Sequence, residues 1–122
     1  MATTRRFTLM HVDEFERPWP KWLLARRSLG IGSFGMNVCH LEPGERIPEH
    51  DETERDQEEV FVTLAGTPTF VVDGEEHAAP PGTFLRLDPE PKRYVRNDAG
   101  EPARVLIVSA PRTSGYEPMG WA

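Results

Sequence analysis

The sequence predicts an all-β domain, a sandwich or a small barrel, and three observations carry this prediction. Short runs rich in β-branched and aromatic residues alternate with turn signals along most of the chain. The 12 prolines and 10 glycines are spread along the chain, which suits many short strands better than a helical bundle. The length of 122 residues fits one domain, and a hydrophobic content of 38% is enough for a core.

The N-terminal part contains the only helix that we expect. Residues 7–12 predict a short first strand, and Pro18 and Pro20 then exclude a regular helix in the stretch that follows. Residues 22–30 predict a turn or two of helix that ends at Gly30. Residues 33–44 predict a strand that ends in a Pro-Gly turn.

The rest of the chain predicts strands. Residues 59–66 and 66–78 indicate two strong strands, the second with an Asp-Gly turn, and we expect the two to pair as a hairpin. Further strands are expected at 80–89, 93–97 and 101–111, whereas the tail has no periodicity. Roughly seven or eight short strands separated by turns are typical of sandwiches and barrels.

Charge and cysteine content argue against several classes of protein. The net charge is −6, and a nucleic-acid partner would require a basic stripe. No segment approaches the length of a membrane span, and the N-terminus lacks the apolar run of a signal peptide. Cys39 is the only cysteine, which excludes an intrachain disulfide and fits a reducing compartment. We therefore expect a cytoplasmic protein that binds neither nucleic acid nor membrane.

Residues 44–97 resemble the two motifs of the cupin superfamily, whose members are small β-barrels of the jelly-roll type. The first motif is Gly, five residues, His-x-His, a short gap, Glu, six residues and Gly. Here Gly44, His50, Glu59 and Gly66 match, whereas Glu52 stands where the second histidine belongs. The gap between Glu52 and Glu59 is also longer than the usual three or four residues of the family.

The second motif of the family is Gly, five residues, Pro-x-Gly, two residues, His, three residues and Asn. Gly82 and Asn97 match it, and Arg93 falls on the histidine position. Asp88 replaces the proline and Glu90 replaces the glycine. The frame of the motif is kept, but much of its chemistry is changed.

The resemblance to small single-domain cupins, of the conserved-barrel type called cupin 2, implies a specific architecture. We expect an RmlC-like double-stranded β-helix, or jelly-roll barrel, with at most a short N-terminal helix. The barrel should span residues 36–110, with an N-terminal strand and irregular lead-in over 1–35 and a tail over 111–122. Because cupins commonly pair through strand exchange or sheet packing, the resemblance also implies a homodimer.

The same resemblance suggests which side chains face a ligand pocket. His50 and Glu52 are two residues apart, so on a strand they point to one face. If Glu59 points into the barrel, Phe61 shares its face. Val95 and Asn97 likewise share the face of Arg93. The expected pocket residues are therefore His50, Glu52, Glu59, Phe61, Arg93, Val95 and Asn97. The other acidic residues of the segment, Glu54, Asp56 and Glu58, are interpreted as a hydrated loop.

Cupin metal sites typically use three histidines and one glutamate, and this chain departs from that set. His50, Glu52 and Glu59 could together hold a divalent metal such as Fe, Mn, Zn or Ni, in a hard, oxygen-rich site. Arg93 donates only and cannot be a ligand. It could instead form a bidentate pair with Glu59 or Glu52 that ties the motif strands together without a metal. We favour this metal-poor barrel with no cofactor, and a metal site that includes His40 stays open.

Three functions follow as alternatives. The first is a small-molecule-binding barrel with a sensor, storage or regulatory role, in which Arg93 meets the acid group of a ligand such as an organic acid. The second is an enzyme, either a metal-dependent dioxygenase or isomerase that uses His50, Glu52 and Glu59, or a metal-free one with His50 as general base. The third is a structural or interaction domain with a filled barrel.

A few further side chains have two interpretations each. His40 either lines the cavity or is a hydrogen-bonded structural residue, and Arg86 is either an anion contact in the cavity or a surface residue. Cys39 is expected to be packed rather than nucleophilic, because no histidine partner pattern accompanies it. The tryptophans more often cover a barrel end or a dimer contact than bind a ligand; they are Trp19, Trp22 and Trp121.

Overall fold

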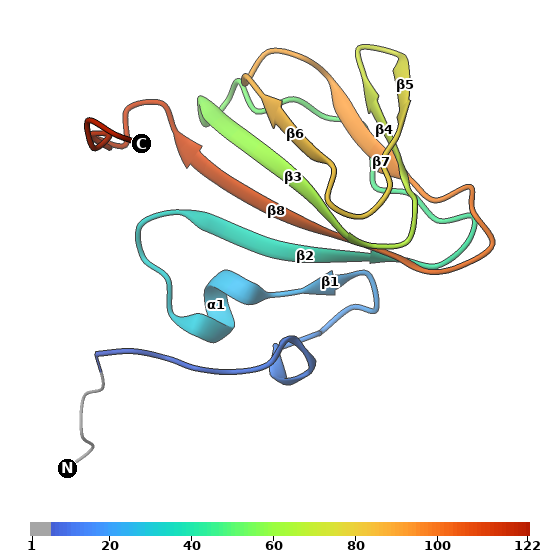
Figure 1. The fold of residues 1–122 in the computed structure, drawn as a ribbon, viewed down its shortest axis with the longest axis horizontal. Helices are drawn as coiled ribbons and strands as arrows, with labels where there is room; N and C mark the ends of the chain where they lie inside the picture. Colours follow the sequence, from blue (N-terminus) through green and yellow to red (C-terminus); the bar gives the residue numbers. More distant parts are fainter. Residues whose placement is uncertain (1–5) are drawn as a thin grey trace.

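The computed structural model describes residues 6–122 and contains two antiparallel sheets that face each other (Figure 1). The larger sheet has the order β1-β2-β8-β3-β6 and the smaller one β5-β4-β7. The strands are β1 (Trp22–Leu23), β2 (Gly35–Leu41), β3 (Gln57–Ala65), β4 (Thr69–Val72), β5 (Glu75–Ala78), β6 (Phe84–Leu87), β7 (Arg93–Arg96) and β8 (Ala103–Pro111). The predicted all-β double-stranded β-helix is confirmed.

The helical content of the described residues is small, as expected. The α-helix α1 (Ala25–Leu29) ends at Gly30, whose left-handed φ of 77° allows the chain to leave the helix. The strand predicted at residues 7–12 is wrong, because this segment finds no partner strand and leads only into a single 3-10 turn, η1 (Val12–Glu14). Residues 1–5 of the expected lead-in lie outside the described residues.

The hairpin predicted between residues 59–66 and 66–78 is also wrong. β3 pairs with β8 and β6, whereas β4 pairs with β5 and β7, so the chain crosses from one sheet to the other at Gly66. A Cβ atom at this glycine would lie 2.4 Å from the carbonyl oxygen of Pro102, so the crossing leaves no space for a side chain. The true hairpin joins β4 to β5, and Asp73 and Gly74 both have the positive φ that a tight two-residue turn requires.

The core lies between the two sheets and follows the alternation of each strand. On β3, Glu59, Phe61 and Thr63 point inward and are buried, whereas the residues between them point outward. Phe61 packs edge-on against Phe70 of the smaller sheet, with ring centroids 5.8 Å apart. The buried cluster comprises Cys39, Leu41, Ile47, Phe61, Phe70, Ala79, Leu87, Val95 and Val105.

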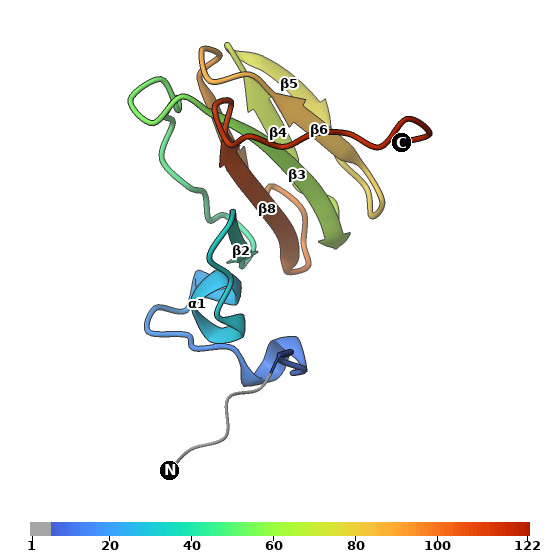
Figure 2. The same ribbon diagram turned by 90° about the vertical axis from the view of Figure 1, so that its left-hand side faces the viewer.

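The two ends of the chain lie outside this core. Figures 1 and 2 show the lead-in with α1 beyond the β2 side of the larger sheet, and the tail leaving the barrel after β8. Trp121 in the tail is 84% exposed. Within residues 6–122, no helix has the length and apolar character that a membrane crossing would require.

Candidate functional site

A cavity of about 540 Å³ opens between the start of β3, the start of β2 and the loop before β3. The register of the larger sheet places Gly35, Ser109 and Glu59 in one row across β2, β8 and β3, and all three line this cavity. The remaining wall combines apolar and polar side chains: Trp22, Met36, Asn37, Ile47, Pro48, His50, Asp51, Glu52, Glu54, Arg55, Gln57, Phe61 and Ile107. This volume is in the range of small-molecule sites, which are about 300–1,000 Å³.

One imidazole and two carboxylates meet in this cavity. One donor atom each of His50, Glu52 and Glu59 lies within 4.8 Å of the others. The His50 Nε2 atom is 3.3 Å from Glu52 Oε1. Backbone hydrogen bonds hold the cluster in place, because His50 exchanges both of its bonds with Arg93 on β7, and Gln57 N–H donates to the carbonyl of Glu52.

Arg93 is fully buried and lies behind this cluster rather than in the cavity. Its Nε is 3.2 Å from Glu59 Oε1, and its other guanidinium nitrogens donate to backbone carbonyls of the loop before β7. These acceptors are the carbonyls of Asp88, Pro89 and Pro91. The guanidinium therefore meets a carboxylate through one nitrogen instead of the bidentate fork that the sequence suggested, and it has no contact with the cavity except through Glu59.

Glu59 is a buried carboxyl group with a raised pKa. Burial raises the pKa of its carboxyl group, the neighbouring Glu52 raises it further, and Arg93 and His50 act in the opposite direction. The contact with Arg93 is close but poorly aligned, so that Glu59 Oε1 and Arg93 Nε are both left without a hydrogen-bond partner. Glu59 is thus a buried acceptor that can take a proton or a hydrogen bond from a bound molecule.

Of the seven expected pocket residues, the structure brings His50, Glu52, Glu59 and Phe61 together around the cavity. The remaining three are Arg93 and Val95 on the inner face of β7 and Asn97 just after it. They lie deeper in the barrel than the cavity wall. Val95 belongs to the apolar core. Asn97 donates to the carbonyls of Leu41 and Glu101 and so holds two chain segments together.

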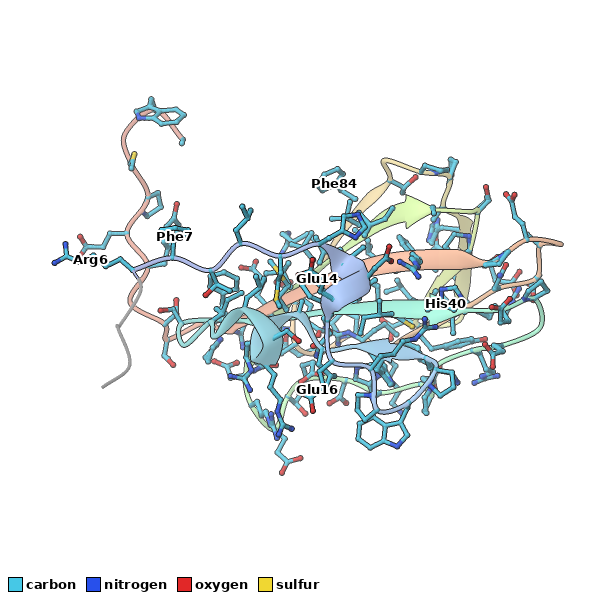
Figure 3. All side chains as sticks on the ribbon, turned by 90° about the horizontal axis from the view of Figure 1, so that it is seen from below. Arg6, Phe7, Glu14, Glu16, His40 and Phe84 are labelled. Carbon is cyan, nitrogen blue, oxygen red and sulfur yellow. The ribbon has the colours of Figure 1, made fainter. Side chains whose placement is uncertain are left out.

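His40 and Arg86, which each had two interpretations, fall outside the cavity, whereas Trp22 lines it. His40 extends from β2 on the outer side of the sheet, where Glu42 Oε1 lies 2.8 Å from Nε2 and Arg104 donates to Nδ1 (Figure 3). It therefore cannot complete a metal site with His50. Arg86 is a surface residue that pairs with Glu58 and Asp88.

Several cavity residues were missed from the sequence. Ser109 could have been found, because it shares the inner face of β8 with Val105 and Ile107 and is polar at an otherwise apolar face. Asn37 follows from the same alternation on β2. Trp22 and Arg55 carry no such signal, since only the path of the chain brings the lead-in and the loop before β3 to this opening.

The donor set can be tested against a resident metal from its chemistry. One imidazole nitrogen and two carboxylates fit a hard divalent cation such as Mn²⁺ or Fe²⁺, and they fit a soft metal poorly. A fourth protein ligand is lacking, because Arg93 occupies the second-motif histidine position and donates only. The site is therefore a three-ligand set with a fixed positive charge behind it.

Comparison with known proteins agrees with this architecture. A model of the cupin domain matches residues 37–109. A cupin protein from Bacteroides fragilis is similar in structure, with a TM-score of 0.79 at 22% sequence identity, covering 97% of this chain and 94% of the other. A double-stranded β-helix protein from Klebsiella pneumoniae has a TM-score of 0.69 at 21% identity, covering 88% of this chain and 92% of the other.

A third similar structure is described as a sugar phosphate isomerase from a cupin superfamily, from Silicibacter pomeroyi. Its TM-score is 0.70 at 22% identity, with 84% of this chain and 75% of the other covered. No curated protein matches the chain. At these identities the structures agree in fold, and the match to the domain model covers more than half of the sequence, so the chain belongs to the cupin family.

Proposed function

We propose that the protein binds a small, hydroxyl-rich molecule in the open end of the barrel, without a resident metal. The observation that carries this proposal is the pair of carboxyl groups, Glu52 and Glu59, on the wall of a cavity of about 540 Å³. Carboxylates accept hydrogen bonds from hydroxyl groups, and both of these residues line the cavity. Trp22 and Phe61 supply apolar surface at the same wall.

Charge pairing supports a site that does not depend on a metal. Glu52 has His50 as its partner at 3.3 Å, and Glu59 has Arg93 at 3.2 Å. A divalent cation would have to compete with the fixed charge of Arg93, which lies beside one of its two carboxylate ligands. The open cavity also argues against a side-chain-filled barrel with a purely structural role.

A screen of neutral sugars and polyols in EDTA-containing buffer tests the proposal. Ligand-observed NMR should detect binding to the wild type, and binding should fall in Glu52→Gln and Glu59→Gln. Glu54→Gln is the matched control, because this exposed carboxylate also lines the cavity but lies outside the cluster. Binding that disappears with EDTA and returns with a divalent metal would overturn the metal-independent site.

A second candidate is a site for a divalent cation, favoured by the 4.8 Å spacing of His50, Glu52 and Glu59. A metal held by these three side chains would act as a Lewis acid on a substrate oxygen, the chemistry that an isomerase requires, and a redox-active ion such as iron would be needed for a dioxygenase. Metal analysis by mass spectrometry on untagged protein separates the two candidates, together with melting curves in EDTA, iron, manganese, zinc and nickel. About one metal per chain with melting lowered by EDTA would favour the cation site.

We also propose that a second copy of this chain covers the apolar patch around Phe84 on the outer face of the larger sheet, leaving the ion pair of Glu58 and Arg86 exposed. Phe84, Val62 and Leu106 lie directly opposite one another on that face, and Phe84 is 72% exposed (Figure 3). Such an apolar face suits an interface. Sedimentation equilibrium should give a dimer for the wild type and a monomer for Phe84→Ser. Leu9→Ser, at an exposed position outside this face, should leave the dimer intact.

A further inference from the structure

A second cavity, of about 480 Å³, lies directly beside the first. The two cavities share part of their walls: Gly35, Met36, Asn37, Arg55, Gln57 and Ser109. A Cβ atom on Gly35 would lie only 2.5 Å from Ser109 Oγ, so the glycine leaves this hydroxyl group the space it occupies at the junction. One elongated molecule could therefore reach into both cavities.

The charges of the two walls differ in sign. Among the described residues, the first wall carries Asp51, Glu52, Glu54 and Glu59 and one arginine, Arg55. The second wall has no carboxylate from residues 6–122, and its charged residues in that range are Arg26 and Arg55. Ser33, Asn37, Gln57 and Ser109 add hydroxyl and amide donors to it.

Neither of these two arginines has a carboxylate partner among residues 6–122. Other arginines, such as Arg17, Arg46 and Arg104, also lack one in this range, but they line neither cavity. Arg26 donates only to the carbonyl of Ile31, at 3.2 Å, and Arg55 has no side-chain partner in the described part of the chain. Arg27, the neighbour of Arg26 on α1, is paired with Glu16. Arg112, which contacts the residue next to Arg55, is paired with Asp56 and Glu90.

Guanidinium groups without a carboxylate partner are suited to bind an oxyanion, because their N–H groups match the oxygens of phosphate and carboxylate groups. Arg93 cannot take this role, since it is buried and its donors are used by Glu59 and by backbone carbonyls. The anion contact that the sequence assigned to Arg93 therefore moves to the arginines of the second cavity.

We propose that the physiological ligand carries an oxyanion, held between Arg26 and Arg55, on a hydroxylated body that reaches the His50, Glu52 and Glu59 cluster. The shared chemistry is that of a phosphate ester or a sugar acid. This assignment rests on the proposed function for the first cavity and adds the ligand class and two specificity-determining residues to it.

Isothermal titration of EDTA-treated protein with four molecules tests the assignment: glucose, glucose 6-phosphate, gluconate and inorganic phosphate. At least one anionic sugar should bind about tenfold or more tightly than glucose, because its charged group forms charge-assisted hydrogen bonds with the guanidinium groups. Tighter binding of glucose 6-phosphate than of glucose identifies a phosphate ester as the ligand class, and tighter binding of gluconate identifies a sugar acid. The double variant Arg26→Gln/Arg55→Gln should bind both as weakly as glucose.

Arg27→Gln is the matched control, because it removes an exposed arginine from the same helix without changing either cavity. Melting curves of all variants check that the fold is intact. Glucose that binds as well as its anionic forms, or an unchanged advantage in the double variant, would overturn the oxyanion site and leave the proposed function standing. Absence of binding by every anionic member would also overturn the oxyanion site.

Failure of the proposed function gives a different result. Inorganic phosphate would then bind to the wild type and not to the double variant, while Glu52→Gln and Glu59→Gln would leave the affinity for glucose 6-phosphate unchanged. That outcome supports the oxyanion site and rejects a ligand body held by the carboxyl cluster.

Discussion

Glu58 and Glu59 are neighbours on β3, and each lies close to an arginine, but the two ion pairs occupy opposite environments. Glu58 faces outward and lies 3.1 Å from Arg86, with the two side chains 50% and 61% exposed. Glu59 faces inward and lies 3.2 Å from Arg93, with the side chains 7% and 0% exposed. Nearly equal distances therefore describe a screened surface contact and a desolvated pair beside the cavity.

Burial, more than distance, therefore determines how much an ion pair contributes to the stability of this barrel. On the surface, water screens both charges, so the pair contributes little. Inside, each charge depends on its partner, because neither can be hydrated well. The inner pair is also poorly aligned, since Glu59 Oε1 and Arg93 Nε lie 3.2 Å apart and are both without a hydrogen-bond partner among residues 6–122.

The largest expected effect is on the inner pair. Arg93→Met should lower the free energy of unfolding by about 3–5 kcal/mol, because it leaves Glu59 buried without its cation and removes donors from three backbone carbonyls. Urea unfolding measures this loss. The double variant Arg93→Met/Glu59→Leu should lose less than the sum of the two single variants, and a strictly additive result would contradict the pairing.

Cys39 extends the comparison to β2, where it faces inward while His40 faces outward. Burial raises the pKa of its thiol from 9.0 to about 12. The fraction of Cys39 that is present as thiolate at pH 8 is therefore about a thousandfold lower than for an exposed cysteine. Alkylation with iodoacetamide should be correspondingly slow in the folded protein and should reach the ordinary rate in urea. Rapid labelling of the folded protein would show that the core is more open than described.

The pH dependence of stability should also distinguish the two environments. Because the pKa of Glu59 is raised, the folded protein holds this proton more tightly than the unfolded chain. The contribution of Glu59 to the stability of the fold is fully present below its ordinary pKa of 4.5. It is lost as the pH rises through the pKa of Glu59 in the folded protein. The wild type should therefore lose stability relative to Glu59→Gln as the pH rises above 4.5.

The outer face should show the opposite sign. A hydrogen bond from Arg86 lowers the pKa of Asp88 below its ordinary value of 3.8. The contribution of Asp88 to stability is therefore present above pH 3.8 and is lost as the pH falls. Unfolding curves of wild type, Glu59→Gln and Asp88→Asn between pH 3 and 8 would measure both trends. A wild type that gains stability over Glu59→Gln with rising pH would contradict the raised pKa.

The smallest expected effect is on the outer pair. Arg86→Met should leave the urea midpoint close to that of the wild type, because both partners of the removed contacts stay hydrated. Any loss should shrink further in high salt, which screens exposed charges. A loss as large as that of Arg93→Met would remove the distinction between the two faces of β3.

Much of the inner face could be predicted from local alternation. Alternate residues of a strand share a face, so one inward-facing residue on each strand predicts the others. The buried residues agree with this: Glu59 and Phe61 on β3, and Arg93 and Val95 on β7. The motif spacing supplied that member, and it brought His50, Glu52 and Glu59 to one place. The helix ending at Gly30 followed from the ability of glycine to adopt a positive φ.

Other features depend on residues that are distant in the sequence. The hairpin prediction failed because alternation indicates that β3 and β4 are strands but not which strands they pair with. The sequence suggested that Arg93 faces inward and pairs with Glu59 or Glu52, and the pair with Glu59 is present. Nothing local indicated that loop carbonyls would take its other donors and hold it away from the cavity.

The fold class, the inner faces of the strands and the acidic cluster could thus be predicted from the amino acids alone, because each depends on short-range periodicity or on motif spacing. The sheet pairing, the depth of Arg93 and the presence of Arg26 and Arg55 in one cavity wall could be seen only in the folded barrel. These depend on where the chain returns after long excursions, and that is settled by the packing of the whole barrel rather than by the residues nearby.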